Sequence, residues 1–315
     1  MRKFLLILTF LLFACFVLFG LIRNKSANFG TEDTQGVLSD KVTVANSWFP
    51  KSENDANLSD VSVGASASIL VNYDTGEVLQ AKNSSQRLPG ASTIKIMTAL
   101  VALEHAELDD IYAVSANASK IGEDSMGLSE GENLSMEDLL YGLMLLSGND
   151  AAVTLAEGIA RSEDAFVAMM NLKSKELGLA DTKFINVTGL DVDEEIQFTT
   201  AHDLATLARY TWDKYPAFRK IAATDHIFID ANASHKAFDM YNVTNLLTSY
   251  PGVKGIKPGF TWEAGYCLVT YAENNNVKLI GVLLNSPDRR GEMTRLLDAG
   301  FAKYQVKVEH PQLAL

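Results

Sequence analysis

The order of apolar and polar residues divides the chain into two groups of strands separated by a long helical stretch. Alternating and β-branched runs predict strands at 67–73 and 77–82, joined by the turn-forming Asp74-Thr75-Gly76. Apolar positions with helical spacing predict helices at 92–105, 136–146, 150–160, 163–177 and 201–212. Strand patterns return at 255–261, 265–272 and 277–284, and a last helix is expected from about 288 to 302.

Local signals support the ends of several of these helices. Ser135-x-x-Asp138 and Thr200-x-x-Asp203 have the form of capping boxes, and Gly178 is typical of a helix C-terminus. Because the two groups of strands are distant in sequence, the simplest way to bury both is one mostly antiparallel sheet flanked by helices. We therefore expect an α+β fold with a single large domain.

The chain begins with an apolar segment. Residues 4–22 carry no charge, and as a helix they would rise about 28 Å, near the thickness of a bilayer core. We interpret residues 1–25 as a membrane anchor with the bulk of the chain outside the cytoplasm; a cleaved signal peptide is the alternative, although no clear A-x-A site follows. Polar residues 26–60 are predicted to be a flexible linker, 61–308 the folded domain and 309–315 a tail.

The charge, cysteine and histidine content of the chain argues against nucleic-acid binding, a disulfide within the domain and a bound metal. After residue 25 the chain carries 23 Lys and Arg against 39 Asp and Glu, a formal charge of −16, which argues against nucleic-acid binding. Cys15 lies in the apolar segment and Cys267 in an apolar run, so no disulfide within the domain is expected. No metal or cofactor is expected, because the histidines lack the spacing of metal ligands; they are His105, His202, His226, His235 and His310.

The first candidate for chemistry is Ser92-Thr93-Ile94-Lys95. The two polar side chains share a helix face one turn apart, and the start of a helix favours a developing oxyanion. The residues around Lys95 are apolar, so burial should lower the pKa of its amine until the neutral form can act as a base. Ser-x-x-Lys alone occurs by chance about once in a chain of this size. A capping serine with a solvated lysine is the alternative, but the apolar neighbours argue against it.

Two further motifs follow in order. Ser147-Gly148-Asn149 lies between two predicted helices, where Ser147 could relay a proton and Asn149 could contact a substrate amide; an ordinary interhelical turn is the alternative. Lys257-Pro258-Gly259 lies in a predicted strand, where Gly259 would let an extended substrate backbone approach closely. Pro-Gly is also a strong turn signal, so a plain turn stays open here.

Together the three motifs resemble those of the serine D-Ala-D-Ala carboxypeptidases, the low-molecular-mass penicillin-binding proteins. The similarity covers about Ala65 to Tyr304. Besides the motifs it includes Pro89-Gly90-Ala91, Ser125-Met126-Gly127-Leu128, Asp138-Leu139-Leu140-Tyr141-Gly142-Leu143, Asp150-Ala151-Ala152 and Glu263-Ala264-Gly265-Tyr266. The resemblance implies the β-lactamase and transpeptidase-like fold, which adds a helical subdomain to the sheet.

The resemblance also implies a role for each motif residue. Ser92 would attack the carbonyl between the two terminal D-alanines with Lys95 as general base, giving an acyl-enzyme that water hydrolyses. Ser147 would help carry the proton to the leaving D-alanine, and Asn149 would hold a substrate amide. Lys257 would place positive charge near the substrate carboxylate and Lys95.

The resemblance further implies that the backbone N–H groups of Ser92 and Phe260 form the oxyanion hole, next to Gly259. The family usually has Lys-Thr-Gly in the third motif, and its threonine hydroxyl contacts the substrate carboxylate; Pro258 has neither hydroxyl nor N–H. Thr261 is the candidate substitute donor. Many relatives also carry a second β-rich domain and a C-terminal anchor, so here we expect the N-terminal segment to reach the membrane.

The resulting hypothesis is a D,D-carboxypeptidase that trims peptidoglycan stem peptides at a membrane and is acylated by β-lactams. A D,D-endopeptidase of the same family is one alternative. A low-turnover protein that binds cell-wall peptide or β-lactam is another, because of Pro258. A β-lactamase is disfavoured, since no Glu-x-x-Leu-Asn motif is present.

Overall fold

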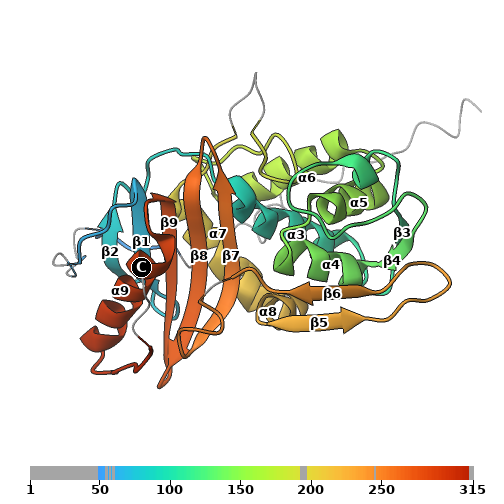
Figure 1. Cartoon of the computed structure of the whole chain (residues 1–315). Helices are drawn as coiled ribbons and strands as arrows, with labels where there is room; N and C mark the ends of the chain where they lie inside the picture. Colours follow the sequence, from blue (N-terminus) through green and yellow to red (C-terminus); the bar gives the residue numbers. More distant parts are fainter. Residues whose placement is uncertain are drawn as a thin grey trace, which may run out of the picture. The chain divides into compact units, whose positions relative to one another are not determined.

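The computed structural model describes residues 49–53, 56, 58, 61–191, 197–244 and 246–311. These residues form a five-stranded antiparallel sheet in the order β2-β1-β9-β8-β7 (Figure 1). Its strands are β1 (Ala67–Asn72), β2 (Val78–Lys82), β7 (Val253–Thr261), β8 (Gly265–Asn274) and β9 (Val277–Ser286). The predicted mostly antiparallel sheet is confirmed, and β1 pairs directly with β9.

The sheet buries both of its faces because successive side chains of a strand point to opposite sides. Leu70 and Leu283 pack with Leu297 of helix α9 (Arg289–Lys303) in one apolar cluster. Ile69 and Val282 belong to the other cluster, which lies against helix α7 (Ala201–Lys214). The runs of apolar residues in β1 and β9 therefore reflect burial on two sides rather than one.

Helices gather on the β7 side of the sheet (Figure 1). They are α3 (Lys95–His105), α4 (Met136–Leu145), α5 (Asn149–Ala160), α6 (Glu163–Glu176) and α8 (Pro216–Ala222). Ser135 accepts the backbone N–H of Asp138, and Thr200 accepts that of Asp203, so both capping predictions are confirmed. Gly178 follows α6 with φ of +70°, a conformation that glycine adopts without strain.

Several short elements were not predicted from the sequence. Two small antiparallel sheets pair β3 (Ile111–Ala113) with β4 (Asn133–Ser135) and β5 (His226–Ile229) with β6 (Phe238–Tyr241). Strands of three or four residues are too short to give a recognisable alternation. Helix α8 begins at a proline in its first position and has only seven residues, so its apolar pattern covers less than two turns.

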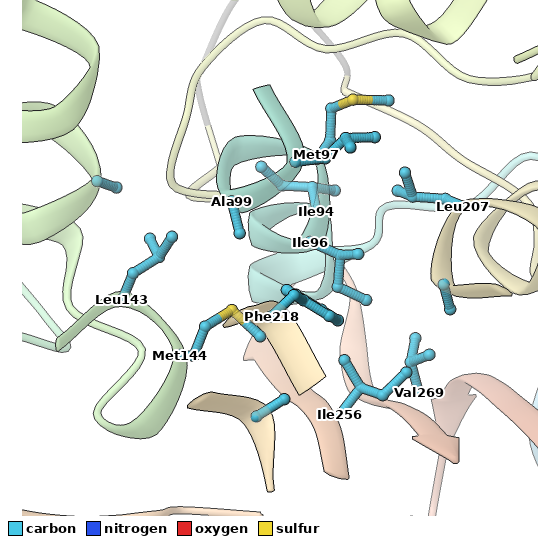
Figure 2. Close-up of a cluster of buried hydrophobic side chains, with 14 of the residues drawn as sticks. Ile94, Ile96, Met97, Ala99, Leu143, Met144, Leu207, Phe218, Ile256 and Val269 are labelled. Carbon is cyan, nitrogen blue, oxygen red and sulfur yellow. The ribbon is translucent and has the colours of Figure 1, made fainter. Parts of the chain in front are cut away.

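Helix α3 runs through the middle of the domain, and apolar side chains surround it on all sides (Figure 2). Ile96 and Met97 are fully buried. Their surroundings include Leu143 and Met144 of α4, Leu207 of α7, Phe218 of α8, Ile256 of β7 and Val269 of β8. The expectation of a helix buried nearly all round is confirmed, and it places the beginning of α3 inside the protein.

The predicted anchor at 1–25 and most of the predicted linker lie outside the described residues. Within the described ranges, no helix is long and apolar enough to cross a membrane. The described end of the linker contacts the folded domain, because the N–H of Lys51 donates to Gly76 O at 2.7 Å and that of Leu58 to Leu79 O at 3.1 Å. At the other end, His310 of the predicted tail packs beside Tyr250.

Candidate active site

Ser92 lies in a short 3-10 turn, Ala91–Ile94, that leads directly into α3. The predicted helix at 92–105 therefore starts as a 3-10 turn and becomes α-helical at Lys95. Ser92 is nearly buried, and Lys95 is fully buried. Lys95 Nζ lies 2.9 Å from Ser92 Oγ. The motif spacing thus gives the expected contact between a hydroxyl and an amine.

Lys95 Nζ also contacts three other oxygen atoms. It lies 2.8 Å from Asn149 Oδ1, 2.7 Å from the carbonyl of Thr188 and 3.4 Å from Ser147 Oγ. The amide and carbonyl oxygens can only accept hydrogen bonds. A neutral lysine amine has two N–H groups and one lone pair, so the two acceptors occupy its donors and the lone pair is directed to Ser92. The surroundings hold the amine in the orientation of a base toward the serine.

The electrostatics of the site favour that neutral amine. Burial lowers the pKa of Lys95 well below its ordinary value, and the nearby Lys257 lowers it further, while Asp124 and other acids oppose the shift. Lys257 is also fully buried, and burial lowers its pKa from 10.5 to about 7, with a smaller contribution from Arg289. Two buried lysines in one site cannot easily both carry a proton.

The turn between α4 and α5 supplies Ser147 and Asn149, as the sequence predicted. Ser147 adopts a positive φ of +61°, and the N–H of Gly148 donates to Gly142 O, which together close the turn tightly. Asn149 Nδ2 donates to Gly122 O at 2.9 Å while its Oδ1 faces Lys95. The amide is therefore fixed from both ends.

Asp150, next to this motif, has a role that the sequence did not reveal. Its buried carboxylate accepts the backbone N–H groups of Met126, Gly127 and Leu128 at 2.8–2.9 Å, and the hydroxyl of Ser125 at 2.6 Å. One side chain at the start of α5 thus holds the loop that passes the mouth of the site. Both stretches, 125–128 and 150–152, resemble the family in sequence, and this was the one sign that they matter. Their contact could not be predicted, because it joins residues more than twenty positions apart.

The other wall of the site is β7, at the end of the sheet order. Gly259 lies so close to the Ser92 turn that an added Cβ would be 2.9 Å from Ser92 N and 3.1 Å from Thr93 N. Lys257 points into the protein, whereas the Phe260 side chain is partly exposed. Lys257, Gly259 and Phe260 therefore lie in one strand beside the nucleophile, as predicted. Pro258 is accommodated in that strand, opposite Leu268.

The Ser92 turn is also bounded on its second side by a glycine. Gly189 adopts φ of +87°, and an added Cβ would lie 2.2 Å from Ala91 O. The neighbouring carbonyl of Thr188 is the one that Lys95 contacts. This contact was missed from the sequence because a backbone carbonyl leaves no residue-type signal.

Two polar residues complete the strand wall. Thr261 Oγ1 donates to Asp191 Oδ1 at 3.0 Å and accepts the N–H of Ala264, so its single proton is already engaged within the protein. Arg289, at the start of α9, donates to Gly259 O at 2.8 Å and lies over the ring of Tyr266. Arg289 was not identified from the sequence, since it is remote from the motifs. It brings a permanent positive charge to the strand that we expected to bind a carboxylate.

The site combines a serine hydroxyl, a buried amine in contact with it and an edge strand beside both. This combination defines a serine-type acyl-transfer enzyme. Among the residues that the structure describes, no cluster of three or more His, Cys, Asp or Glu side chains could hold a metal ion.

Comparison with known proteins places this site in a family. Residues 52–288 match the D-alanyl-D-alanine carboxypeptidase family. The chain is 37% identical over 278 residues to the D-alanyl-D-alanine carboxypeptidase DacF of Bacillus subtilis, covering 86% of this chain and 69% of that protein. For DacC of Escherichia coli K12 the identity is 34% over 266 residues, covering 78% and 63%. The chain belongs to the D-alanyl-D-alanine carboxypeptidase family and spans roughly two thirds of the length of these relatives.

Solved structures agree with that assignment. The crystal structure of the Streptomyces K15 DD-transpeptidase has a TM-score of 0.71 and 30% sequence identity, covering 76% of this chain and 98% of that one. The D-alanyl-D-alanine carboxypeptidase of Mycobacterium tuberculosis H37Rv also has a TM-score of 0.71 and 30% identity, covering 81% and 95%. The family, the fold class and the serine-type hydrolase class expected from the motifs are confirmed.

Proposed function

We propose that the chain removes the terminal D-alanine from peptidoglycan stem peptides through an acyl-enzyme on Ser92. The observation that carries this proposal is the 2.9 Å contact between Ser92 Oγ and the fully buried Lys95 amine, whose pKa is lowered. A hydroxyl is a weak nucleophile unless a base takes its proton. The site supplies that base inside the protein, where burial lowers the pKa of the amine and favours its neutral form.

The first half of the reaction forms the acyl-enzyme. Ser92 Oγ attacks the carbonyl of the penultimate D-alanine while its proton passes to Lys95 Nζ. The backbone N–H groups of Ser92 and Phe260 stabilise the oxyanion of the tetrahedral intermediate. When the intermediate collapses, the C–N bond breaks, and Ser147 relays the proton from Lys95 to the leaving amine.

The second half releases the shortened peptide. Water attacks the Ser92 ester, and Lys95 takes a proton from it and returns one to Ser92 Oγ. Asn149 holds an amide of the bound peptide throughout. Because Asn149 is fixed by Gly122 as well as by Lys95, substrate binding and the orientation of the base depend on the same side chain.

Carboxylate recognition differs from the usual arrangement of the family. Pro258 offers no hydroxyl, and the Thr261 proton is engaged by Asp191. We infer that the terminal carboxylate is held by the charges of Lys257 and Arg289 rather than by a hydroxyl. Such ionic contacts are individually stronger than neutral hydrogen bonds but less directional.

The proposed setting is the outer face of a membrane. The uncharged stretch at 4–22, with Arg2 and Lys3 before it, supports an anchor that leaves the catalytic domain extracytoplasmic. Peptidoglycan stem peptides are exposed on that side, and β-lactams reach it from outside.

The test combines one labelling and one turnover measurement. The protein is incubated with a pentapeptide ending in D-Ala-D-Ala, and the products are identified by mass spectrometry. In a separate measurement, a fluorescent penicillin reports acylation. We expect release of one D-alanine and a label that disappears in Ser92→Ala. Label retained by Ser92→Ala, or none on the wild type, would contradict the acyl-enzyme on Ser92. Labelling without D-alanine release would favour the low-turnover binding protein, and cleavage restricted to cross-linked dimers would favour the endopeptidase.

A further inference from the structure

The segment between α6 and α7 contacts the catalytic lysine through its backbone. Residues 184–190 of this segment form neither helix nor strand, yet the carbonyl of Thr188 lies 2.7 Å from Lys95 Nζ. In a helix or a sheet, the backbone hydrogen bonds would fix the direction of such a carbonyl. Here side chains must fix it instead. The residues that bind this segment therefore bear on the orientation of the base.

The side chain of Asn186 organises the segment. Its Oδ1 accepts the N–H of Gly189 at 2.7 Å, and both the N–H and the hydroxyl of Thr188 at 3.2 Å. Its Nδ2 donates to Leu190 O at 2.9 Å. Asparagine is suited to such a turn, because its side chain can bind the backbone two residues further on. One amide thus ties together the turn at 186–190 that carries the Thr188 carbonyl.

Asn186 is itself held in place from the other end of the segment. Gln197 Oε1 accepts the N–H of Ile185 at 2.9 Å and that of Asn186 at 3.3 Å. Asn186 and Gln197 are both nearly buried. A nearly buried amide whose oxygen and nitrogen are both bonded keeps one geometry, since breaking a bond would leave a buried polar group unpaired. The turn is therefore fixed and not merely one of several loop conformations.

The turn fits closely against both reacting residues. An added Cβ on Gly189 would lie 2.2 Å from the carbonyl oxygen of Ala91, the residue before the nucleophile. On helix α3, Thr98 Oγ1 donates to Val187 O at 2.8 Å, and Thr98 lies about one turn after Lys95. A shift of the turn would therefore change its position relative to both the nucleophile and the base.

The contact with Thr188 decides where the amine of Lys95 directs its lone pair. A neutral amine has two N–H groups, and the Thr188 carbonyl and Asn149 Oδ1 accept them. Loss of the Thr188 acceptor frees one N–H, so the amine can turn its lone pair away from the serine. Proton transfer suffers from this change more than ligand binding does, because β7 stays paired with β8.

Resting on the proposed function, we propose that Asn186 is a positioning residue for the base Lys95. Through the turn at 186–190 it holds the Thr188 carbonyl against the amine, and the amine in turn keeps its lone pair on the serine hydroxyl. Asn186 acts on the reaction through Thr188 and not on the substrate. Its contribution falls on acylation and on deacylation alike, because both steps use the same base.

The test measures stopped-flow acylation by a fluorescent penicillin, which separates the dissociation constant of the first complex from the rate of acylation. We expect Asn186→Ala to lower the rate by about 10–100-fold while the dissociation constant stays within about twofold of the wild type, as for a displaced catalytic group. Asn186→Ser keeps an oxygen that can accept the N–H two residues on, so its rate should lie between the two. The acyl-enzyme of Asn186→Ala should also persist longer.

Asn171→Ala is the matched control. Asn171, on α6, binds the same segment before the turn: its Nδ2 donates to Phe184 O at 2.7 Å, and its Oδ1 accepts the N–H of Phe184 at 3.0 Å. This variant also removes hydrogen bonds from the segment and should lose stability in urea, yet its acylation rate should stay near that of the wild type. Equal slowing by Asn171→Ala and Asn186→Ala would show general loosening of the segment and overturn the proposal.

Crystal structures of the wild type and of both Asn186 variants give a readout that needs no turnover. We expect the Lys95 Nζ to Thr188 O contact to exceed hydrogen-bond distance in Asn186→Ala, and Asn186→Ser carries the comparison if the alanine variant does not fold. The positioning role is refuted if the contact is retained, if the acylation rate is unchanged or if only the dissociation constant changes. A wild type that is not acylated would contradict the proposed function, whereas the position of the carbonyl would still decide the role of Asn186.

Discussion

The two walls of the active site are built in different ways. The helical wall is a polar network in which Lys95 contacts four oxygen atoms and Asp150 accepts four backbone N–H groups and a hydroxyl. In the strand wall, the only hydrogen bond of the Lys257 ammonium among the described residues goes to Pro258 O, at 3.3 Å. That wall is held instead by backbone pairing with β8 and by apolar packing.

This difference indicates which changes each wall tolerates. A network in which every member has a partner loses several hydrogen bonds when one member is removed. A strand fixed through its backbone can exchange side chains, provided that they fit an edge position. The presence of Pro258 in place of the usual threonine, in a site whose helical wall retains the family residues, agrees with that distinction.

The largest effect is expected at the centre of the helical wall. Lys95→Met removes the base, so acylation by penicillin should slow by about 10²–10⁴-fold. The variant should not gain stability, because Asn149 Oδ1 and the Thr188 carbonyl lose their donor inside the protein. Stopped-flow acylation and urea unfolding measure the two effects. A Lys95→Met protein that is clearly more stable than the wild type would contradict the idea of a fully paired wall.

Asp150→Ala tests the same wall away from the reacting atoms. Loss of the carboxylate leaves buried N–H groups of the 126–128 loop without their acceptor, and we expect a loss of about 3 kcal/mol in the free energy of unfolding. Asp150→Asn, which keeps one acceptor oxygen, should lose less. Chemical denaturation at neutral pH checks both variants. Equal stability of the two would show that the acceptor count is not what fixes the loop.

In the strand wall, Lys257→Met should have the opposite effect on stability. The folded pKa of Lys257 is about 7, below the ordinary 10.5, so between these values the unfolded chain binds more protons and the stability of the wild type rises with pH. The cost of burying the charge is complete below pH 7 and absent above 10.5. Lys257→Met should therefore be more stable than the wild type by about 1–4 kcal/mol at pH 6, and by less at pH 10.

Unfolding curves of both proteins across this pH range measure the difference, and D-alanine release should be strongly reduced in the variant. A stability difference that does not change with pH would mean that Lys257 does not titrate in this window.

The smallest effect is expected at Pro258. Pro258→Thr restores a hydroxyl where the family has one, and kcat/KM for a peptide with a free terminal carboxylate should rise severalfold, up to about tenfold, as one added hydrogen bond allows. The corresponding peptide amide should gain nothing. If neither peptide responds, the Lys257 and Arg289 charges already suffice for recognition. An equal gain for both peptides would show that the added hydroxyl does not act through the carboxylate.

The sequence predicted best what depends on short spacing or long periodicity. Ser92 and Lys95, three residues apart, and Ser147 and Asn149, two apart, could be paired without knowing the fold, because a helix or a tight turn fixes their geometry. Strands β8 and β9 carry ten residues each, which is enough for a recognisable pattern. Strands β3 and β4, which form a separate small sheet, carry three residues each and were missed.

What could not be predicted are contacts made across long separations by groups without a characteristic residue type. The carbonyl of Thr188 reaches Lys95 from 93 positions away, and Arg289 reaches Gly259 from 30 positions away. Thr261 shows the converse case, because its hydroxyl is in the right strand but is already bound to Asp191. Only the packed chain determines whether a polar group is still available to a ligand.

The pairing of β1 with β9 has a consequence for how the enzyme matures during its synthesis. Ser92 and Lys95 leave the ribosome long before Lys257 and Gly259, and the strand that joins the N-terminal hairpin to the rest of the sheet is the last of the five to be made. Pairing between such distant segments forms late and slowly. Until residues 277–286 have emerged, β7 and β8 of a nascent chain are not yet joined to β1 and β2, so the sheet that positions the strand wall beside the nucleophile is incomplete. We therefore expect the growing chain to remain inert toward penicillin, so that hydrolytic competence arrives in a single step near the end of translation.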